Sequence, residues 1–286
     1  MKCSGDMMAF RVDENLSETE VVNNTQRRRE FQTRTVITEE SGEKMVYKCA
    51  AGLESRPFIK LIVEREERNI DYLEGQFEVL RGCLQGDRIK YAYLGGRSLK
   101  DMIIEHMKEG HHDAACELLK EYVKRINSLG RINAVPEVFL CDIVNDSANE
   151  FAAIDCLERG VLDLICKNIL ISGGHWIVID NEWSFDFPVP VRFLLFRAIR
   201  EIIFTEQVAI RRAANKAHPV TGLFAGRWYK FYVPIEWLEY LIEGEIGLER
   251  LIRWEVGFQR YVNGPSYASH LRAVKKPRIR RQFFLM

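Results

Sequence analysis

One short segment constrains the fold more than any other, because its polar residues stand at fixed places around two apolar runs. Residues 169–171 (ILI) and 176–179 (WIVI) are short and rich in β-forming residues, with Ser-Gly-Gly between them. Glycines between two such runs predict a β-hairpin. Asp163 precedes the hairpin, Asn168 stands at its start and Asp180 at its exit. The hairpin can therefore direct an amide and a carboxylate toward one point.

This spacing is typical of phosphoryl transfer. Magnesium prefers hard oxygen ligands and usually takes one or two carboxylates plus phosphate oxygens. Asn168 and Asp180 suit such a metal, and Asp163, five residues before the amide, can hold an attacking hydroxyl. A D-x-x-x-x-N motif followed by an Asp with apolar neighbours is the arrangement that kinases use. The three residues therefore predict a magnesium-dependent kinase site.

The rest of the chain predicts a strand-rich first third and a largely helical remainder. Periodicity, turn residues and a candidate N-cap at Ser98 indicate strands at 31–38, 44–50 and 88–94, and helices at 56–73, 98–108, 112–129, 191–213 and 234–262. This order predicts an α+β fold in two unequal lobes. We expect an N-lobe over residues 1–93, a C-lobe over 94–270 and a basic tail over 271–286. A ligand is expected in the cleft between the lobes.

Charge is balanced overall but uneven along the chain. Lysine plus arginine equals aspartate plus glutamate, at 41 each, yet no acid follows Glu255 and seven basic residues do. Apolar residues alternate with these charges in the tail. Peripheral contact with a membrane surface, at the inner membrane, is therefore an alternative to a solvated end. The tail contains no recognisable nucleic-acid module, so nucleic acid is not an expected partner.

The cysteines and the apolar runs indicate the compartment. The seven cysteines include no CxxC pair, which argues against a zinc site or a disulfide framework and for a reducing compartment. The first residues show no signal-peptide pattern, and no apolar run reaches the roughly 18 residues of a membrane span. The sequence therefore predicts a cytoplasmic protein.

Several segments resemble one family. The chain is similar to the protein-kinase-like superfamily, in its aminoglycoside-phosphotransferase-like branch. More narrowly, it resembles the kinase domain of the bifunctional methyltransferase–kinase that caps O-antigen polymannose. The similarity runs from about residue 20 to 270 and is carried by FQTRT (31–35), VYKCA (46–50), YAYLGGRSL (91–99), DLICKNILI (163–171), VIDNEWSFDFPVPVRFLLFRAI (178–199) and FQRYVNG (258–264). It implies a bilobal protein-kinase-like fold with a strand-rich N-lobe and a mainly helical C-lobe.

The resemblance also implies roles for single residues, with ATP and Mg²⁺ as cofactors. Asp163 would be the catalytic base, and Asn168 and Asp180 the metal ligands. Lys48 would contact the nucleotide's phosphates and assist catalysis. Its partner would be Glu66, which helical spacing selects, although Glu64 would suit a shorter loop between strand and helix. The adenine would lie along Tyr91, Ala92, Tyr93 and Leu94. Without an ordinary phosphate loop, Thr25 and Arg27 could contact the phosphates.

The sequence departs from better-known kinases at two places, and these departures leave alternative functions open. Val161 and Leu162 stand where better-known kinases have His-Arg or His-Gly, and residues 21–31 contain no glycine-rich loop. The expected reaction is transfer of the γ-phosphate to a hydroxyl of a sugar or glycan end, with a nucleotide and a carbohydrate acceptor as partners. A pseudokinase that acts as a binding or scaffold module is one alternative. A small-molecule phosphotransferase of the aminoglycoside type is another. With Leu162 before it, Asp163 is expected to have an ordinary or slightly raised pKa.

Overall fold

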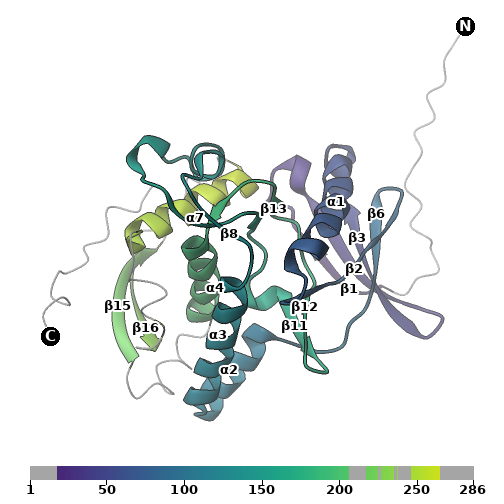
Figure 1. Ribbon diagram of the computed structural model, residues 1–286. Helices are drawn as coiled ribbons and strands as arrows, with labels where there is room; N and C mark the ends of the chain where they lie inside the picture. The colour runs from purple at the N-terminus through teal and green to yellow at the C-terminus, as the bar shows by residue number, and fades with distance from the viewer. Residues whose placement is uncertain (1–17, 206–216, 225–226, 235–236, 238–245, 265–286) are drawn as a thin grey trace, which may run out of the picture.

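The computed structural model describes residues 18–205, 217–224, 227–234, 237 and 246–264. The strand-rich part of the chain and the helix-rich part lie on opposite sides of a central hairpin (Figure 1). This arrangement confirms the predicted α+β fold in two lobes, with a strand-rich N-lobe and a mainly helical C-lobe. The boundary near residue 93 stays a prediction, and the basic tail (271–286) lies outside the described residues.

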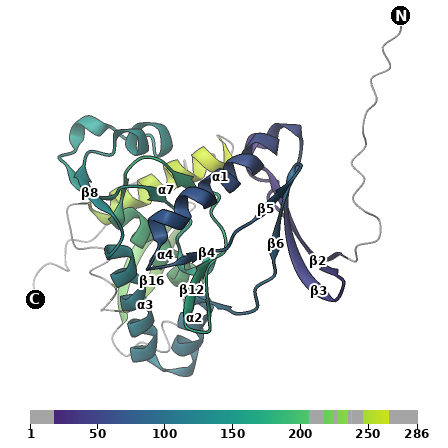
Figure 2. The same cartoon turned by 45° about the vertical axis from the view of Figure 1, so that its right-hand side comes forward.

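The N-lobe is built on one antiparallel sheet. Its five strands have the order β1-β2-β3-β6-β5, with bounds β1 Glu18–Asn23, β2 Thr33–Glu40, β3 Glu43–Ala50, β5 Cys83–Gln85 and β6 Arg88–Ala92. Helix α1 (Arg56–Leu73) follows two short helical turns, η1 (Arg29–Phe31) and η2 (Leu53–Ser55). In Figure 2, α1 runs between this sheet and the rest of the chain. The predicted strands at 31–38, 44–50 and 88–94 and the predicted helix at 56–73 are therefore confirmed.

The hairpin that the glycines predict is also confirmed. Strand β11 (Ile169–Ser172) pairs with β12 (His175–Val178) in antiparallel register, with Ile169 opposite Val178. The short strands β7 (Arg97–Ser98) and β4 (Glu78–Val79) extend this sheet on either side. Gly173 and Gly174 form the turn with φ of 57° and 85°, a conformation that glycine adopts without steric cost. The hairpin therefore places Asn168 and Asp180 at the same end of the sheet.

The C-lobe surrounds the hairpin with helices. Among the described residues these helices are α2 (Leu99–Glu109), α3 (His112–Asn127), α4 (Val191–Thr205) and α7 (Leu248–Asn263). Short turns and strand pairs connect them: β8 (Arg131–Ala134), η3 (Phe139–Ile143), η4 (Ala148–Glu150), β9 (Ile154–Leu157), β10 (Gly160–Val161), η5 (Cys166–Asn168), β13 (Ser184–Phe185) and β14 (Val189–Pro190). Ser98 caps α2 as expected, since its hydroxyl accepts a hydrogen bond from the Asp101 amide at 3.1 Å.

The longest strand pair of the described C-lobe was not expected. Residues 217–234 carry an antiparallel hairpin, β15 (Ala217–Phe224) with β16 (Arg227–Pro234), between the segments predicted as helices. Of those segments, 191–213 is helical as far as Thr205, and residues 206–216 lie outside the described part. Of the segment 234–262, only residues 234, 237 and 246–262 are described, and they contain most of α7.

Aromatic packing joins the two lobes around Trp183. The Trp183 ring lies 5.0 Å from the Phe31 ring, 5.3 Å from Phe58 of α1 and 5.9 Å from Phe258 of α7, measured between centroids. Tyr261 completes the cluster at 6.0 Å from Trp183. Aromatic pairs at these distances stabilise by roughly 0.5–1.5 kcal/mol beyond the burial of their area. The cluster therefore fixes α7 against the N-lobe directly beside the exit of the central hairpin.

Helix α7 also approaches the backbone of the C-lobe very closely at Gly257. A Cβ atom at this position would lie 2.1 Å from the carbonyl oxygen of Val144, far inside van der Waals contact. Gly247, at the N-cap of the same helix, has no atom within 4 Å of the equivalent point and an ordinary φ of −67°. Only the first glycine is therefore required by packing.

Gly257→Ala is expected to lower the free energy of unfolding by about 2 kcal/mol. A contact this close to backbone costs about 3 kcal/mol, the upper end of the usual overpacking range, and better helix propensity offsets roughly 1 kcal/mol of it. Gly95→Ala, at an exposed loop position where a Cβ would meet no atom within 4 Å, is the control and should leave stability nearly unchanged. Urea unfolding followed by circular dichroism measures both. A Gly257→Ala protein as stable as the control would contradict this account of α7 packing.

Candidate active site

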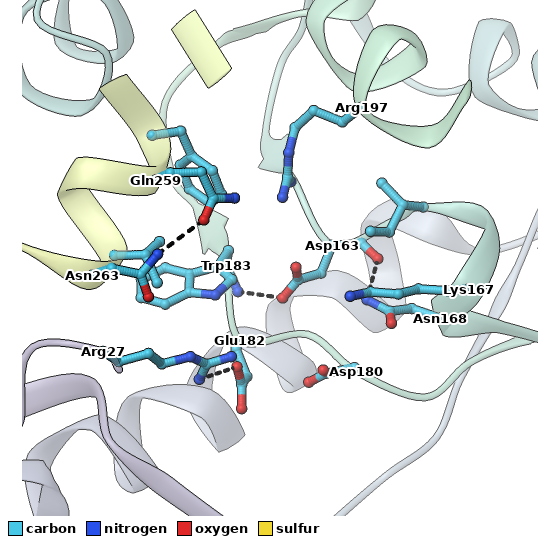
Figure 3. Close-up of a pocket in the computed structure, with 13 residues that line it drawn as sticks. Arg27, Asp163, Lys167, Asn168, Asp180, Glu182, Trp183, Arg197, Gln259 and Asn263 are labelled. Carbon is cyan, nitrogen blue, oxygen red and sulfur yellow. Dashed lines mark hydrogen bonds and ion pairs between the residues drawn. The ribbon is translucent and has the colours of Figure 1, made fainter. Parts of the chain in front are cut away.

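A polar pocket of about 190 Å³ lies where the hairpin exit, the loop before β2 and helix α7 meet. Its polar and aromatic lining side chains point toward one another (Figure 3). They include Arg27, Asp163, Lys167, Asn168, Asp180, Glu182, Trp183, Arg197, Gln259 and Asn263. The sequence-predicted Asp163, Asn168 and Asp180 therefore line one pocket, together with Arg27.

The orientation of Asn168 is set by its backbone and by Asp163. The Ile179 amide donates to the Asn168 carbonyl at 2.9 Å, which closes the open end of the hairpin. The Asn168 side-chain amide donates to the backbone carbonyl of Asp163 at 2.9 Å. A carboxamide that donates through its nitrogen presents its oxygen on the other side. The side chain therefore offers a hard oxygen ligand, as a magnesium site requires.

Asp163 is buried and held by the segment that follows the hairpin. Its Oδ2 accepts a hydrogen bond from the Trp183 amide at 2.7 Å, and the residue is only 7% exposed. Burial raises the pKa of Asp163 to about 7, and the nearby Asp180 and Glu182 carboxylates add to the rise. The rise is larger than the sequence predicts, because burial and these two acids depend on tertiary structure. Arg197 lines the pocket and donates to the Leu162 carbonyl.

Lys48 lies on the central strand β3 and reaches the hairpin exit. Its ammonium is 2.7 Å from Asp180 Oδ1 and 2.8 Å from Glu182 Oε1. Burial disfavours the charged ammonium, but Asp180 and Glu182 outweigh it and hold the pKa of Lys48 well above its usual value. Lys48 is therefore a cation at the exit of the hairpin, beside Asp180.

The expected pairing of Lys48 with Glu66 is wrong in this structure. Glu66 is buried as helical spacing predicts, whereas Glu64 is exposed and contacts Arg68. However, Glu66 Oε1 accepts from the Tyr91 hydroxyl at 2.6 Å and its Oε2 from the Gly82 amide at 3.1 Å. Burial raises the pKa of Glu66 to about 7. Its hydrogen bonds go to β6 and the segment before β5, and Glu182 has taken the position beside Lys48.

Glu182 is the principal residue that sequence reasoning missed. Besides Lys48, its carboxylate binds the Arg27 guanidinium at 2.6 Å and accepts from the Thr33 hydroxyl at 3.4 Å. Arg65 of α1 donates to its backbone carbonyl. Burial would raise its pKa, but Lys48 and Arg27 outweigh burial and lower the pKa of Glu182 to about 2. The available signal was a second acid two residues after Asp180, directly before Trp183.

The loop before β2 brings one of its two predicted phosphate-contacting residues to the pocket. Gln32 holds it by donating to the carbonyls of Thr25 and Arg27, at 3.1 and 2.8 Å. Arg27 enters the pocket and lies 5.7 Å from the Trp183 ring centroid, while Thr25 is exposed and outside the pocket lining. The Arg28 amide donates to the Val262 carbonyl of α7 at 3.1 Å. The structure therefore brings Arg27, but not Thr25, to the site.

The predicted adenine segment lies at the end of β6. Tyr91 is buried against Glu66, and Ala92 is paired with Met45 of β3. The Tyr93 amide donates to the Lys44 carbonyl at 3.3 Å, and Leu94 follows as a half-buried residue. None of Tyr91, Ala92, Tyr93 and Leu94 lines the pocket around Asp163. Their contact with a nucleotide stays a prediction.

Comparison with known proteins finds similarity of structure and none of sequence. No protein-family model and no curated protein matches the chain. A thermostable mutant of aminoglycoside phosphotransferase APH(4)-Ia, in a ternary complex with ADP and hygromycin B, is 10% identical with a TM-score of 0.47, over 90% of this chain and 93% of that one. A type I macrolide 2'-phosphotransferase is 11% identical with a TM-score of 0.42, over 91% and 93%. Choline kinase LicA from Streptococcus pneumoniae is 12% identical with a TM-score of 0.40, over 84% and 88%. Similarities this low assign no activity to this chain.

The raised pKa of Glu66 predicts a pH-dependent loss of stability. An unfolded carboxyl ionises near pH 4.5, whereas folded Glu66 holds its proton up to about pH 7. Stability should therefore fall as pH rises from 4.5 to 7, by about 3 kcal/mol from this group, at 1.36 kcal/mol per pKa unit.

Glu66→Gln mimics the protonated acid and can still bond both Tyr91 and Gly82. Its free energy of unfolding should exceed that of the wild type at pH 7.5 and vary less between pH 4.5 and 7. Glu64→Gln, on the exposed face of the same helix, is the control. Parallel pH profiles for the wild type and Glu66→Gln would show that Glu66 ionises normally.

Proposed function

We propose that this protein is an ATP- and Mg²⁺-dependent kinase that transfers the γ-phosphoryl group to a hydroxyl of a sugar or glycan end. The observation that carries the proposal is the convergence of a buried carboxylate, an oxygen-presenting amide and a second carboxylate in one pocket, with Lys48 beside them. This is the set of groups that phosphoryl transfer needs, since its catalysis is mainly positioning and neutralisation of charge. The resemblance to the kinase domain that caps O-antigen polymannose favours a carbohydrate acceptor and a part in lipopolysaccharide biosynthesis.

Each of these residues has a separate role in the proposed phosphoryl transfer. Asn168 through its amide oxygen and Asp180 through its carboxylate would hold Mg²⁺, which neutralises charge on the phosphates when bound. Lys48 and Arg27 would bind phosphate oxygens, and Tyr91, Ala92, Tyr93 and Leu94 the adenine. Asp163 would orient the acceptor hydroxyl, whose oxygen attacks the γ-phosphorus. The bond to the β-phosphate's bridging oxygen breaks, and the hydroxyl proton passes to Asp163.

One observation favours a non-catalytic protein instead of an enzyme. Lys48 is engaged by Asp180 and Glu182 instead of a helix glutamate, and such a fully paired lysine also suits a pseudokinase that only binds partners. The two proposals differ in turnover of Mg-ATP, which a scaffold lacks. A cytoplasmic location, with the basic tail at the inner membrane surface, is part of the proposal. Among the described residues, no helix is long and apolar enough to cross a membrane.

Asp180→Asn is expected to abolish Mg²⁺-dependent ATP turnover, because a neutral amide does not replace the carboxylate's charge at the metal. ADP release measured across a Mg²⁺ titration checks this. Asp155→Asn, which alters an exposed acid paired with Arg131, is the control and should turn over normally. Turnover of Asp180→Asn within about tenfold of the wild type, or about 1.4 kcal/mol of barrier, would remove Asp180 as the principal ligand.

Asp163→Asn is expected to leave Mg-ATP affinity nearly unchanged while lowering phosphoryl transfer at least about a hundredfold, the lower end of what a general base contributes. The amide oxygen can still accept from the Trp183 amide, so the loop should keep its shape. Calorimetry of ATP binding and a turnover assay on the same preparation separate the two effects. Loss of ATP binding would instead move Asp163 to the metal, and unchanged turnover would favour the scaffold.

A further inference from the structure

The inward face of α7 ends in two carboxamides that share the pocket with Asp163. Gln259 and Asn263 lie one helical turn apart, and both line the pocket (Figure 3). Neither serves the nucleotide or the metal in the proposed mechanism. Both belong to helix α7 of the C-lobe, whereas Arg27 and Lys48 belong to the N-lobe.

A buried ion pair fixes which way Gln259 points. Glu255, which is 4% exposed, accepts from Arg197 Nε at 3.1 Å and from Arg200 at 2.8 Å. Burial would raise the pKa of Glu255, but the two arginines outweigh burial and lower it. An ionised carboxylate only accepts hydrogen bonds. The Gln259 side chain, 3.0 Å away, must therefore turn its nitrogen to Glu255 and its oxygen the other way.

The orientation of Gln259 in turn fixes that of the Asn263 side chain. The Gln259 oxygen needs a donor, and the Asn263 amide nitrogen supplies it at 2.9 Å. The Asn263 oxygen consequently faces away from Gln259, and within the described part of the chain no protein group donates to it. The ion pair at Glu255 thus sets the orientation of an amide two helical turns further along, at the edge of the pocket.

We propose that Asn263 recognises the acceptor by accepting a hydrogen bond from a second hydroxyl, next to the one that Asp163 activates. Gln259 and Glu255 are positioning residues that fix the Asn263 oxygen toward the pocket. This inference rests on the proposed kinase function and narrows its acceptor to a polyhydroxylated ring with neighbouring hydroxyls. An amide oxygen that is oriented before the acceptor binds selects a hydrogen-bond donor, such as a hydroxyl. The second N–H of the Asn263 amide can donate to a further hydroxyl beside it.

The test uses methyl glycosides of mannose, glucose and galactose as acceptor probes, with ADP release as the signal. For each glycoside that accelerates ADP release, Asn263→Ala should raise its KM by roughly three- to tenfold, the worth of one hydrogen bond. The KM for ATP and the kcat should stay within about twofold of the wild type, since Asn263 touches neither nucleotide nor reacting atoms. Asn127→Ala, at the exposed end of α3, is the matched control.

Monodeoxy analogues of the accelerating glycoside identify the contact. One deoxy analogue should lose affinity with the wild type and show no further loss with Asn263→Ala, as coupled groups do in a double-mutant cycle. Gln259→Leu removes the hydrogen bonds that link Glu255 to Asn263 but no contact with the acceptor. It should also raise the KM for the glycoside. Its unfolding temperature checks that the helix persists.

The outcomes separate this inference from the proposed function. A KM for the glycoside that is the same in Asn263→Ala and Asn127→Ala overturns the role of Asn263. In that case the kinase proposal would still stand, provided that the wild type turns over Mg-ATP and Asp180→Asn does not. No acceleration by any glycoside overturns the sugar-ring acceptor, whereas absence of Mg²⁺-dependent turnover overturns the kinase itself.

Discussion

The site depends on one buried carboxylate, that of Glu182. It binds Lys48 of β3 and Arg27 of the loop before β2, and its own backbone belongs to the exit of the central hairpin. Three segments distant in sequence are thereby held at one point. Removing one partner from such a buried cluster leaves an unpaired charge and costs roughly 3–5 kcal/mol. The geometry at Asp180, two residues away, is therefore tied to the position of both cations.

Trp183 complements this electrostatic link with packing and with backbone hydrogen bonds. Its ring holds Phe31, Phe58 and Phe258 together, and its amide fixes the Asp163 carboxylate. The Leu162 amide donates to the Trp183 carbonyl at 2.9 Å, so the two segments run side by side. Adjacent residues of the hairpin exit thus perform different tasks: Asp180 faces the pocket, Glu182 joins the lobes and Trp183 supports Asp163.

The sequence predicted the features that local pattern controls. The β11–β12 hairpin, helices α1 to α3 and the burial of Glu66 follow from periodicity, glycine placement and capping. The convergence of Asp163, Asn168 and Asp180 followed from the hairpin, because pairing of its strands brings its two ends together. The role of each residue in a reaction stays a prediction.

What the sequence could not supply depends on contacts between distant segments. Glu182 and Glu66 are both buried acids, and only the tertiary structure decides which one meets Lys48. The raised pKa of Asp163 likewise comes from burial and from neighbours on other elements. The hairpin β15–β16 was missed because it lies between the two predicted helices, in a segment to which no element was assigned. The orientation of Asn263 required the ion pair of Glu255 with arginines of α4.

The hydrogen bond from the Arg28 amide to the Val262 carbonyl has a thermodynamic consequence. It joins the loop that carries Arg27 to the helix end that carries Asn263, one residue from each. Whatever shifts the loop when phosphates arrive must also shift the end of α7 or break this bond. Occupancy of one half of the pocket is therefore linked to affinity at the other, and such linkage acts equally in both directions. Under the proposed function, nucleotide and acceptor would then influence each other's affinity without touching.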